Sequence, residues 1–235
     1  MILRRIAKGL KEQDWLVVII EVMIVVVGIF IGLQVDDWNE NRKERDEENS
    51  YVIRLLGDVE RSLVDLKIDM DGTDSKIADA SRALSLMRSG GVTEMNRKQF
   101  SSDFTRSYAW YGISYHTDTM DELVATGKLE LIRNQKIREG LAQFRLQLKN
   151  REASQEDITD MMKSVYIKLA DNLAKSEDGR ILTNSLSELN GDTVIYRQLR
   201  TLIEWHIALR SQQNSFDASI RKLQKVLTEQ LEQSP

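Results

Sequence analysis

The stretch WLVVIIEVMIVVVGIFIGLQV, residues Trp15–Val35, decides the class of protein to which this chain belongs. Only Glu21 and Gln34 interrupt its apolar character. At about 1.5 Å of rise per residue, a helix of this length measures roughly 31 Å, close to the thickness of the hydrocarbon core of a bilayer. Trp15 and Trp38 stand at its two ends, and tryptophan rings prefer the level of the lipid headgroups. The sequence therefore predicts one transmembrane helix over residues 15–35.

The orientation of this helix depends on its flanks. Residues 1–14, MILRRIAKGLKEQD, read either as a basic amphipathic segment on an anionic membrane surface or as a simple positive flank. The apolar run is too long for a signal peptide and lacks a small-residue cleavage site, so we expect an uncleaved signal anchor. The positive tail favours a cytoplasmic amino terminus, although Arg42, Lys43 and Arg45 nearly balance the count. In a Gram-negative bacterium the main domain is then periplasmic, anchored in the inner membrane.

One face of the predicted membrane helix carries an acid and small residues. Glu21, Val25, Gly28 and Gly32 follow one another at helical spacing, and the two glycines form a GxxxG pair that lets helix backbones approach closely. A carboxylate at the depth of Glu21 is costly unless it is neutral or paired. We expect this face to bind another helix, with protonated Glu21 hydrogen-bonding across the contact. Alternatively, Glu21 reaches the nearby interface and the glycines have no partner.

The composition excludes several function classes. A net charge of −4 and a pI near 5.4 argue against a general nucleic-acid binder, which carries a basic face. The absence of cysteine excludes disulfides, thiolate metal sites and cysteine nucleophiles. The single proline is Pro235, so no internal proline interrupts long helices.

Residues 36–51 are mostly charged or polar and predict a solvated helical stalk, with a disordered linker as the alternative. Residues 52–235 form the predicted soluble domain, which contains three long apolar seams with alternating steps of four and three residues. The first seam comprises Val52, Leu56, Val59, Leu63, Leu66, Met70, Thr73, Ile77, Ala80, Leu84 and Met87. The second comprises Ile137, Leu141, Phe144, Leu148, Arg151, Gln155, Ile158, Met162, Val165 and Leu169. The third comprises Ile195, Leu199, Leu202, His206, Leu209, Gln213, Phe216, Ile220, Leu223 and Leu227.

These seams predict an all-α fold: a single amino-terminal transmembrane helix followed by an elongated three- or four-helix bundle with coiled-coil-like seams. The same pattern suits seams that close within one chain or between chains. Thr73, beside Gly72, suggests a bend in the first helix. At Arg151 and Gln155, either polar core groups set the register or the helix shifts face or breaks, and we favour the first.

Aromatic residues cluster ahead of the second seam. Phe100, Phe104, Tyr108, Tyr111 and Tyr115 follow near-helical spacing and predict one aromatic helix. Such a stripe is more often core than ligand cage, but together with His116 it is also our candidate ligand pocket.

The sequence between and after the seams contains start and stop signals. Ser89-Gly90-Gly91 ends the first seam. Thr119-Met120-Asp121-Glu122 fits a capping box that opens a short helix ended by Gly127, and Asn134 is a candidate N-cap for the next helix. Residues 176–192 read as a connection.

Two groups of short motifs resemble a widespread bacterial family of single-pass membrane proteins known as a domain of unknown function. The first comprises Asp14-Trp15, Val25-Val26-Val27-Gly28, Gln34-Val35 and Trp38-Asn39-Glu40. The second comprises Asp121-Glu122-Leu123, Thr126-Gly127-Lys128-Leu129, Leu131-Ile132-Arg133-Asn134 and Leu141. The resemblance implies a short tail, an anchor and a helical domain, and it transfers no catalytic residues.

The sequence contains no recognisable catalytic, cofactor-binding or metal-binding motif. Of its two histidines, His206 lies in a seam, and His116 has Asp118 and Asp121 nearby but belongs to no HExxH or Glu-x-x-His pair that would hold a metal. We therefore expect a non-enzymatic protein without cofactors, an accessory or scaffold subunit of the bacterial envelope that acts through protein–protein association. Its expected partners are the membrane and either a second copy of itself or another membrane protein. The alternative is a periplasmic sensory or small-ligand-binding bundle that signals through a partner. A hydrolase that uses acidic residues is a third class.

Overall fold

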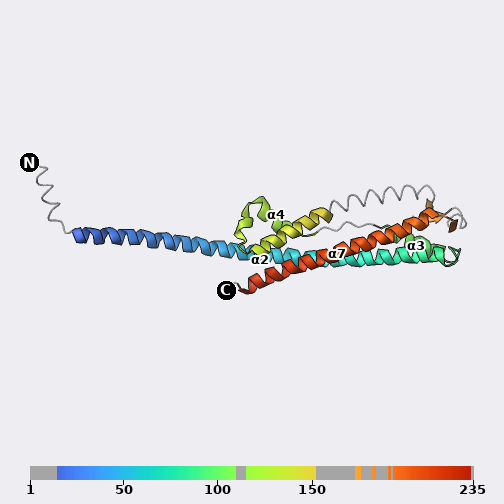
Figure 1. Cartoon of the computed structure of the whole chain (residues 1–235), viewed down its shortest axis with the longest axis horizontal. Helices are drawn as coiled ribbons and strands as arrows, with labels where there is room; N and C mark the ends of the chain where they lie inside the picture. The colour runs from blue at the N-terminus through green and yellow to red at the C-terminus, as the bar shows by residue number, and fades with distance from the viewer. Residues whose placement is uncertain are drawn as a thin grey trace, which may run out of the picture. The chain divides into compact units, whose positions relative to one another are not determined.

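The computed structural model describes residues 15–109, 115–151, 173–175, 181–183, 190–191 and 193–233. The fold class is all-α, as predicted, apart from one hairpin of two three-residue strands. The chain divides into two units, Met1–Ser50 and Tyr51–Pro235, which share the long helix α2 (Trp15–Arg88; Figure 1).

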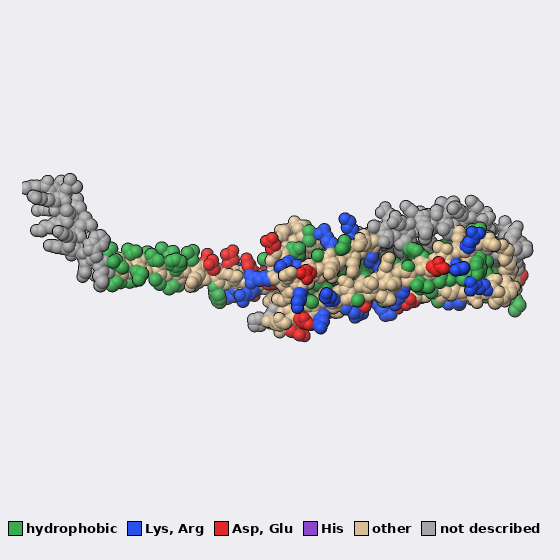
Figure 2. Space-filling model, viewed as in Figure 1, with side chains coloured by type: hydrophobic (Ala, Val, Ile, Leu, Met, Phe, Trp, Pro, Cys, Tyr) green, Lys and Arg blue, Asp and Glu red, His purple; other side chains and the backbone are tan. Residues whose placement is uncertain are grey.

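The amino-terminal part of α2 is apolar and exposed. Large apolar side chains between Ile19 and Val35 are 42–66% exposed, and hydrophobic side chains cover this stretch (Figure 2). Because a helix of this length and composition matches the hydrocarbon core of a bilayer, it is able to span a membrane.

The charged stretch that follows is helical. Within it, Asn41 Nδ2 donates to the carbonyl of Asp37 at 2.8 Å, and the guanidinium of Arg42 lies over the ring of Trp38 at 5.5 Å. These contacts satisfy polar groups one turn apart, which is how a helix that is polar all round is stabilised.

The second unit has its core along two of the predicted seams. Every position of the first seam, and every position of the third, is buried or half-buried within this single chain. The third seam lies on α7 (Thr193–Gln233), which runs beside the second half of α2 (Figure 1). These two seams are therefore buried within the single chain.

The core of this unit consists of two apolar clusters. One combines α2 from Tyr51 to Leu66 with residues 120–148 and with α7 from Phe216 to Leu227. The other combines α2 from Ala80 to Leu84 with α3 and with α7 from Ile195 to Leu202. Polar seam positions lie between them.

At Thr73, where the sequence suggests a bend, α2 continues as a helix. The Thr73 hydroxyl donates to the carbonyl of Asp69 at 3.0 Å, one turn earlier, and accepts a hydrogen bond from Gln213 Nε2 at 2.9 Å. Two polar positions from different seams thus share a hydrogen bond inside the core.

Two glycines follow α2 with positive φ, Gly90 at 109° and Gly91 at 87°. The side chain of Asn190 approaches here: its Oδ1 accepts from the amide of Val92 at 2.6 Å and its Nδ2 donates to the Val92 carbonyl at 2.9 Å. A Cβ on Gly91 would lie 2.8 Å from Asn190 Oδ1. Both the backbone angle and this close approach require glycine at position 91.

The helix α3 (Arg97–Ser107) is shorter than predicted. The aromatic spacing predicts one helix from Phe100 to Tyr115, but the helix ends at Ser107 and Tyr115 lies in non-helical backbone. The prediction fails because regular spacing of aromatic residues reports which side chains are buried, and non-helical backbone can bury them too.

An ion-pair network holds α3 on α2. Asp103 on α3 is fully buried and Asp79 on α2 is nearly so. Arg106 bridges them, with NH2 2.6 Å from Asp103 Oδ1 and Nε 3.0 Å from Asp79 Oδ2, and Arg82 pairs with both carboxylates as well. Each buried carboxylate therefore has charged hydrogen-bond donors from both helices.

The short helix α4 (Asp118–Ala125) begins earlier than the predicted capping box. Its N-cap is Thr117, so Thr119 lies inside the first turn. The amide of Thr119 donates at 3.0 Å to Asp58 Oδ2 on α2. The capping acceptor thus comes from a residue 61 positions away, which no local motif could reveal.

The second group of family-like motifs, which begins with Asp121-Glu122-Leu123, lies in and after α4. Leu123 is fully buried, and Glu122 accepts from Tyr51 Oη at 2.9 Å and pairs with Arg54. These donors lower the pKa of Glu122. The chain then turns at Gly127, which has a φ of 69°, into the 3-10 helix η1 (Lys128–Leu131).

Residues 135–151 form the next helix, and its predicted N-cap is confirmed. Asn134 Oδ1 accepts from the amide of Lys136 at 3.0 Å. At the end of this described stretch, Arg151 NH2 lies 2.6 Å from Asp69 Oδ2 on α2, so this polar seam position has a charged partner. The seam positions from Gln155 to Leu169 lie outside the described residues.

The predicted connection over residues 176–192 overlaps a small hairpin. Strand β1 (Leu173–Lys175) pairs antiparallel with β2 (Ile181–Thr183), with Ala174 opposite Leu182. The sequence pattern did not indicate these strands, because three-residue strands are too short to show an alternation.

The contact of Gly140 with α7 provides a test of helix packing. A Cβ on Gly140 would lie 2.8 Å from Cδ1 of Leu223, which is 2% exposed and has little room to move. We expect Gly140→Ala to lower the free energy of unfolding by about 1 kcal/mol or more, since overpacking outweighs the gain in helix propensity. Urea unfolding followed by circular dichroism measures the change.

The control is Gly72→Ala on α2, where a Cβ meets nothing within 4 Å. Helix propensity alone acts there, so this change should raise the free energy of unfolding by up to about 1 kcal/mol. Equal effects of the two substitutions would contradict the close packing at Gly140.

Candidate functional site

The membrane face predicted from the sequence is open in the structure. Glu21, Val25, Gly28 and Gly32 all lie on α2, and Val25 is 61% exposed. A Cβ added to Gly28 or to Gly32 meets nothing within 4 Å. No described part of the chain covers this face, so it is available to another helix.

The candidate aromatic pocket is divided between the two core clusters. Phe104 and Tyr108 pack together with ring centroids 4.9 Å apart, in the cluster that contains α3. Burial raises the pKa of the Tyr108 phenol, and its hydroxyl has no hydrogen-bond partner among the described residues. Tyr111 lies outside the described residues.

Tyr115 packs in the other cluster. Its ring meets Phe216 edge-on at 5.2 Å and lies 5.5 Å from the guanidinium of Arg151. Its hydroxyl donates to Asp69 at 3.4 Å, and burial raises its pKa. Tyr115 thus belongs to a packed contact between helices, on a different part of the bundle from Tyr108.

His116 is engaged with α2. Its Nε2 lies 3.1 Å from Asp65 Oδ2, and its backbone amide donates to Ser62 Oγ at 3.0 Å. The Ser62 hydroxyl donates in turn to the carbonyl of His116 at 3.4 Å. Since this hydroxyl bonds the backbone and not the imidazole, the three side chains are not arranged as a nucleophile, base and acid.

A buried polar layer separates the two core clusters. It consists of Thr73 and Lys76 on α2 and His206 and Gln213 on α7, all at most 9% exposed. His206 Nε2 lies 3.2 Å from the carbonyl of Ser107, which fits a neutral ring that donates through Nε2. Within the described part of the chain, His206 Nδ1 and Gln213 Oε1 lack hydrogen-bond partners.

Burial explains the electrostatics of this layer. It lowers the pKa of His206 to about 4, with a further decrease from the nearby charge of Lys76, and the Ser107 carbonyl acts in the opposite direction. Burial also lowers the pKa of Lys76. The sequence marked three members of the layer as polar seam positions but missed Lys76, which lies off the seam. Such a layer sets the register of two helices, because slippage would leave polar groups against apolar ones.

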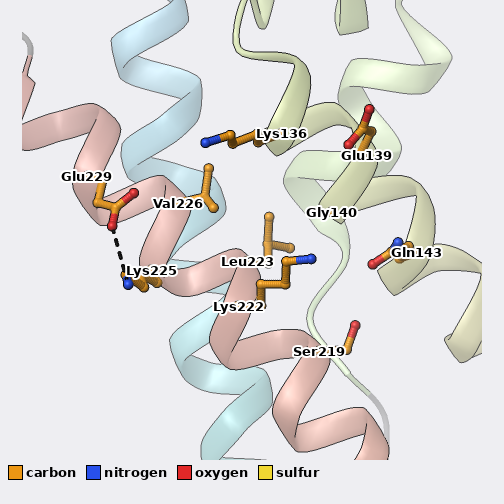
Figure 3. Close-up of a pocket in the computed structure, with 10 residues that line it drawn as sticks. All are labelled: Lys136, Glu139, Gly140, Gln143, Ser219, Lys222, Leu223, Lys225, Val226 and Glu229. Carbon is orange, nitrogen blue, oxygen red and sulfur yellow. Dashed lines mark ion pairs between the residues drawn. The ribbon is translucent and has the colours of Figure 1, made fainter.

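Two grooves flank the helix of residues 135–151. The first, the α7 groove, has a volume of about 550 Å³ between this helix and α7. Figure 3 shows Lys136 and Gly140 facing Leu223 and Val226 across it. Its three lysines are accompanied by Glu139 and Glu229, and Glu229 pairs with Lys225 at 3.7 Å.

The second, the α4 groove, has a volume of about 400 Å³ between the same helix and α4–η1. It combines apolar side chains with Arg138, Arg145 and Lys149. The spacing of these three cations, seven and four residues, puts them on one helix face and could have been noticed in the sequence. Within the residues that the structure describes, no group of three or more His, Asp or Glu side chains could hold a metal ion.

Among the described residues, the open membrane face offers small apolar contacts to a partner, and the α4 groove offers positive charge that no lining acid balances. Comparisons with protein-family models, with curated proteins and with solved structures found no match for this chain.

Proposed function

We propose that this protein is a non-enzymatic, membrane-anchored helical bundle of the bacterial envelope that works as an accessory or scaffold subunit by associating with a second copy of itself. The observation that carries the proposal is the open face of α2, where Gly28 and Gly32 have free space around them. Van der Waals packing at small residues drives the association of membrane helices, since lipid supplies no hydrophobic force between them.

A second surface supports association outside the apolar stretch. Ile53, Val64 and Ile68 on α2 are each 59–62% exposed and share one helix face by their spacing, on the side opposite the buried seam. Two copies anchored in the same membrane have the same orientation, so a face of one copy meets the same face of the other. The membrane thus favours a symmetric dimer.

The proposed orientation has the amino terminus in the cytoplasm and the bundle in the periplasm. The basic residues of the first fourteen positions support it, because positive charge is retained on the cytoplasmic side.

Cysteine cross-linking tests the dimer, and a chain without native cysteine has no background reaction. We expect Val25→Cys to form a disulfide-linked dimer when membranes are oxidised, since Val25 lies on the open face. Met23→Cys is the matched control, because two residues along a helix turn the side chain by about 200° to the other side. Gly28→Leu added to Val25→Cys should reduce the dimer at least fivefold by keeping the backbones apart.

Two results would count against the proposal. Equal cross-linking of Val25→Cys and Met23→Cys would indicate random collisions in the membrane. The second result is a Val25→Cys protein that stays monomeric at the native expression level, under conditions that fully oxidise a control dimer. It would indicate that the helix is only a tether.

A further inference from the structure

The α4 groove has an apolar floor and an apolar wall. Met120 on α4 and Leu141 on the helix of residues 135–151 are 4% and 3% exposed and belong to the core, so they form the floor. Val124 and Leu146 form the wall and are 37% and 59% exposed. Exposed apolar surface around a concave site of about 400 Å³ has the size and character of a small-molecule pocket.

The rim of this groove is positively charged without compensation. Arg138, Arg145 and Lys149 line it, and no Asp or Glu does. This is unexpected in a chain whose 37 acidic residues outnumber its 33 basic ones. Arg145 and Lys149 form no ion pair within the described residues, and Arg138 NH1 donates to the backbone carbonyls of Ile132 and Arg133, which holds its guanidinium at the rim.

The neighbouring α7 groove shows that this charge pattern is specific. It is larger and is likewise lined by three cations, all of them lysines, but Glu139 and Glu229 offset their charge. The two grooves share the helix of residues 135–151 and differ in the second element, α7 in one and α4–η1 in the other, and in charge balance.

From this combination we infer that the α4 groove binds a single-chain anionic amphiphile of the fatty-acid class. The alkyl chain lies against Val124 and Leu146 above the floor, and the carboxylate pairs with Arg145 and Lys149. A concave pocket of this volume suits one alkyl chain better than a protein helix, which needs a longer open surface. The inference is independent of dimer formation, because none of these residues belongs to the open face or to the exposed patch of α2.

Photolabelling tests the inference with the full-length protein in nanodiscs of phosphatidylcholine. The probe is dodecanoate with a diazirine at the end of its chain, and mass spectrometry identifies the labelled residues. We expect label on residues 120–124 and 141–149. Excess dodecanoate should remove this label, whereas dodecanol, which has the same chain without the charge, should compete at least tenfold less effectively. Arg145→Glu combined with Lys149→Glu should reduce this labelling at least tenfold.

The matched control is Lys222→Glu combined with Lys225→Glu in the α7 groove, which should leave the labelling unchanged. Circular dichroism of both charge-reversed proteins verifies that they remain folded, since all four side chains are on the surface. Label confined to residues 15–35 would overturn the inference, as would equal competition by dodecanol or equal loss in both variants. More effective competition by an acidic amphipathic peptide than by dodecanoate would also overturn it, in favour of a protein partner.

Discussion

Phe216→Ala is expected to lower the free energy of unfolding by about 3–5 kcal/mol, the largest effect of any single substitution proposed for this chain. Phe216 is 2% exposed and stacks on Phe144 with ring centroids 5.7 Å apart. It also meets Tyr115 edge-on and lies 5.3 Å from the guanidinium of Arg151. Alanine removes the buried ring and these aromatic contacts together and leaves a cavity where three segments of the chain meet.

Urea unfolding of the full-length protein, followed by circular dichroism, measures this loss. Ile207→Ala is the control on the same helix, since Ile207 is 53% exposed and its removal should change stability by no more than about 0.5 kcal/mol. Phe216→Leu should lose less stability than Phe216→Ala, because leucine fills more of the space that the ring occupies. A loss below 1 kcal/mol for Phe216→Ala would show that this ring does not join the helices.

His206 should make the bundle sensitive to mild acid. Burial lowers its pKa from 6.5 to about 4, so the unfolded chain binds a proton on this ring at a higher pH than the folded chain does. Stability from this group is therefore complete above about pH 6.5 and decreases as the pH falls towards 4, by about 3 kcal/mol in total. Protonation would add an N–H at Nδ1, which has no acceptor among the described residues, close to Lys76.

The measurement compares unfolding free energies between pH 7.5 and pH 4 for the wild type and for His206→Gln. Glutamine does not titrate and can still donate to the Ser107 carbonyl, so the difference between the two proteins isolates the histidine. We expect this difference to change by about 3 kcal/mol across the window, with the wild type losing more. Parallel pH profiles of the two proteins would mean that folding does not lower the pKa of His206.

Much of the helical architecture follows from local patterns. The seam that includes Val59 and Leu66 on α2, and the one that includes Leu199 and Ile220 on α7, are buried as predicted, because one face of a helix must be apolar to pack. The cap at Asn134 depends on neighbouring residues and is also confirmed. The helix assignment fails at Tyr108 and Tyr115, where the aromatic spacing was its only support and the backbone is not helical.

The candidate pocket was less predictable than the fold. Phe104 and Tyr115 are eleven residues apart, but the structure assigns them to different core clusters. The α4 groove was not predicted, although Arg138, Arg145 and Lys149 share a helix face, because a row of cations usually marks a solvated surface. Only the position of α4 beside this row turns it into the rim of a concave site.

By itself, the sequence determined the apolar helix of membrane length, the all-α class and the faces that the long helices bury, since these depend on residue type and helical period within one segment. The tertiary structure decided which segments meet. It decided that Asp58 caps α4, that Thr73 is paired with Gln213, and that His206 is enclosed beside Lys76. These contacts join residues 61 to 140 positions apart, and their geometry depends on the register between helices, which no local pattern specifies.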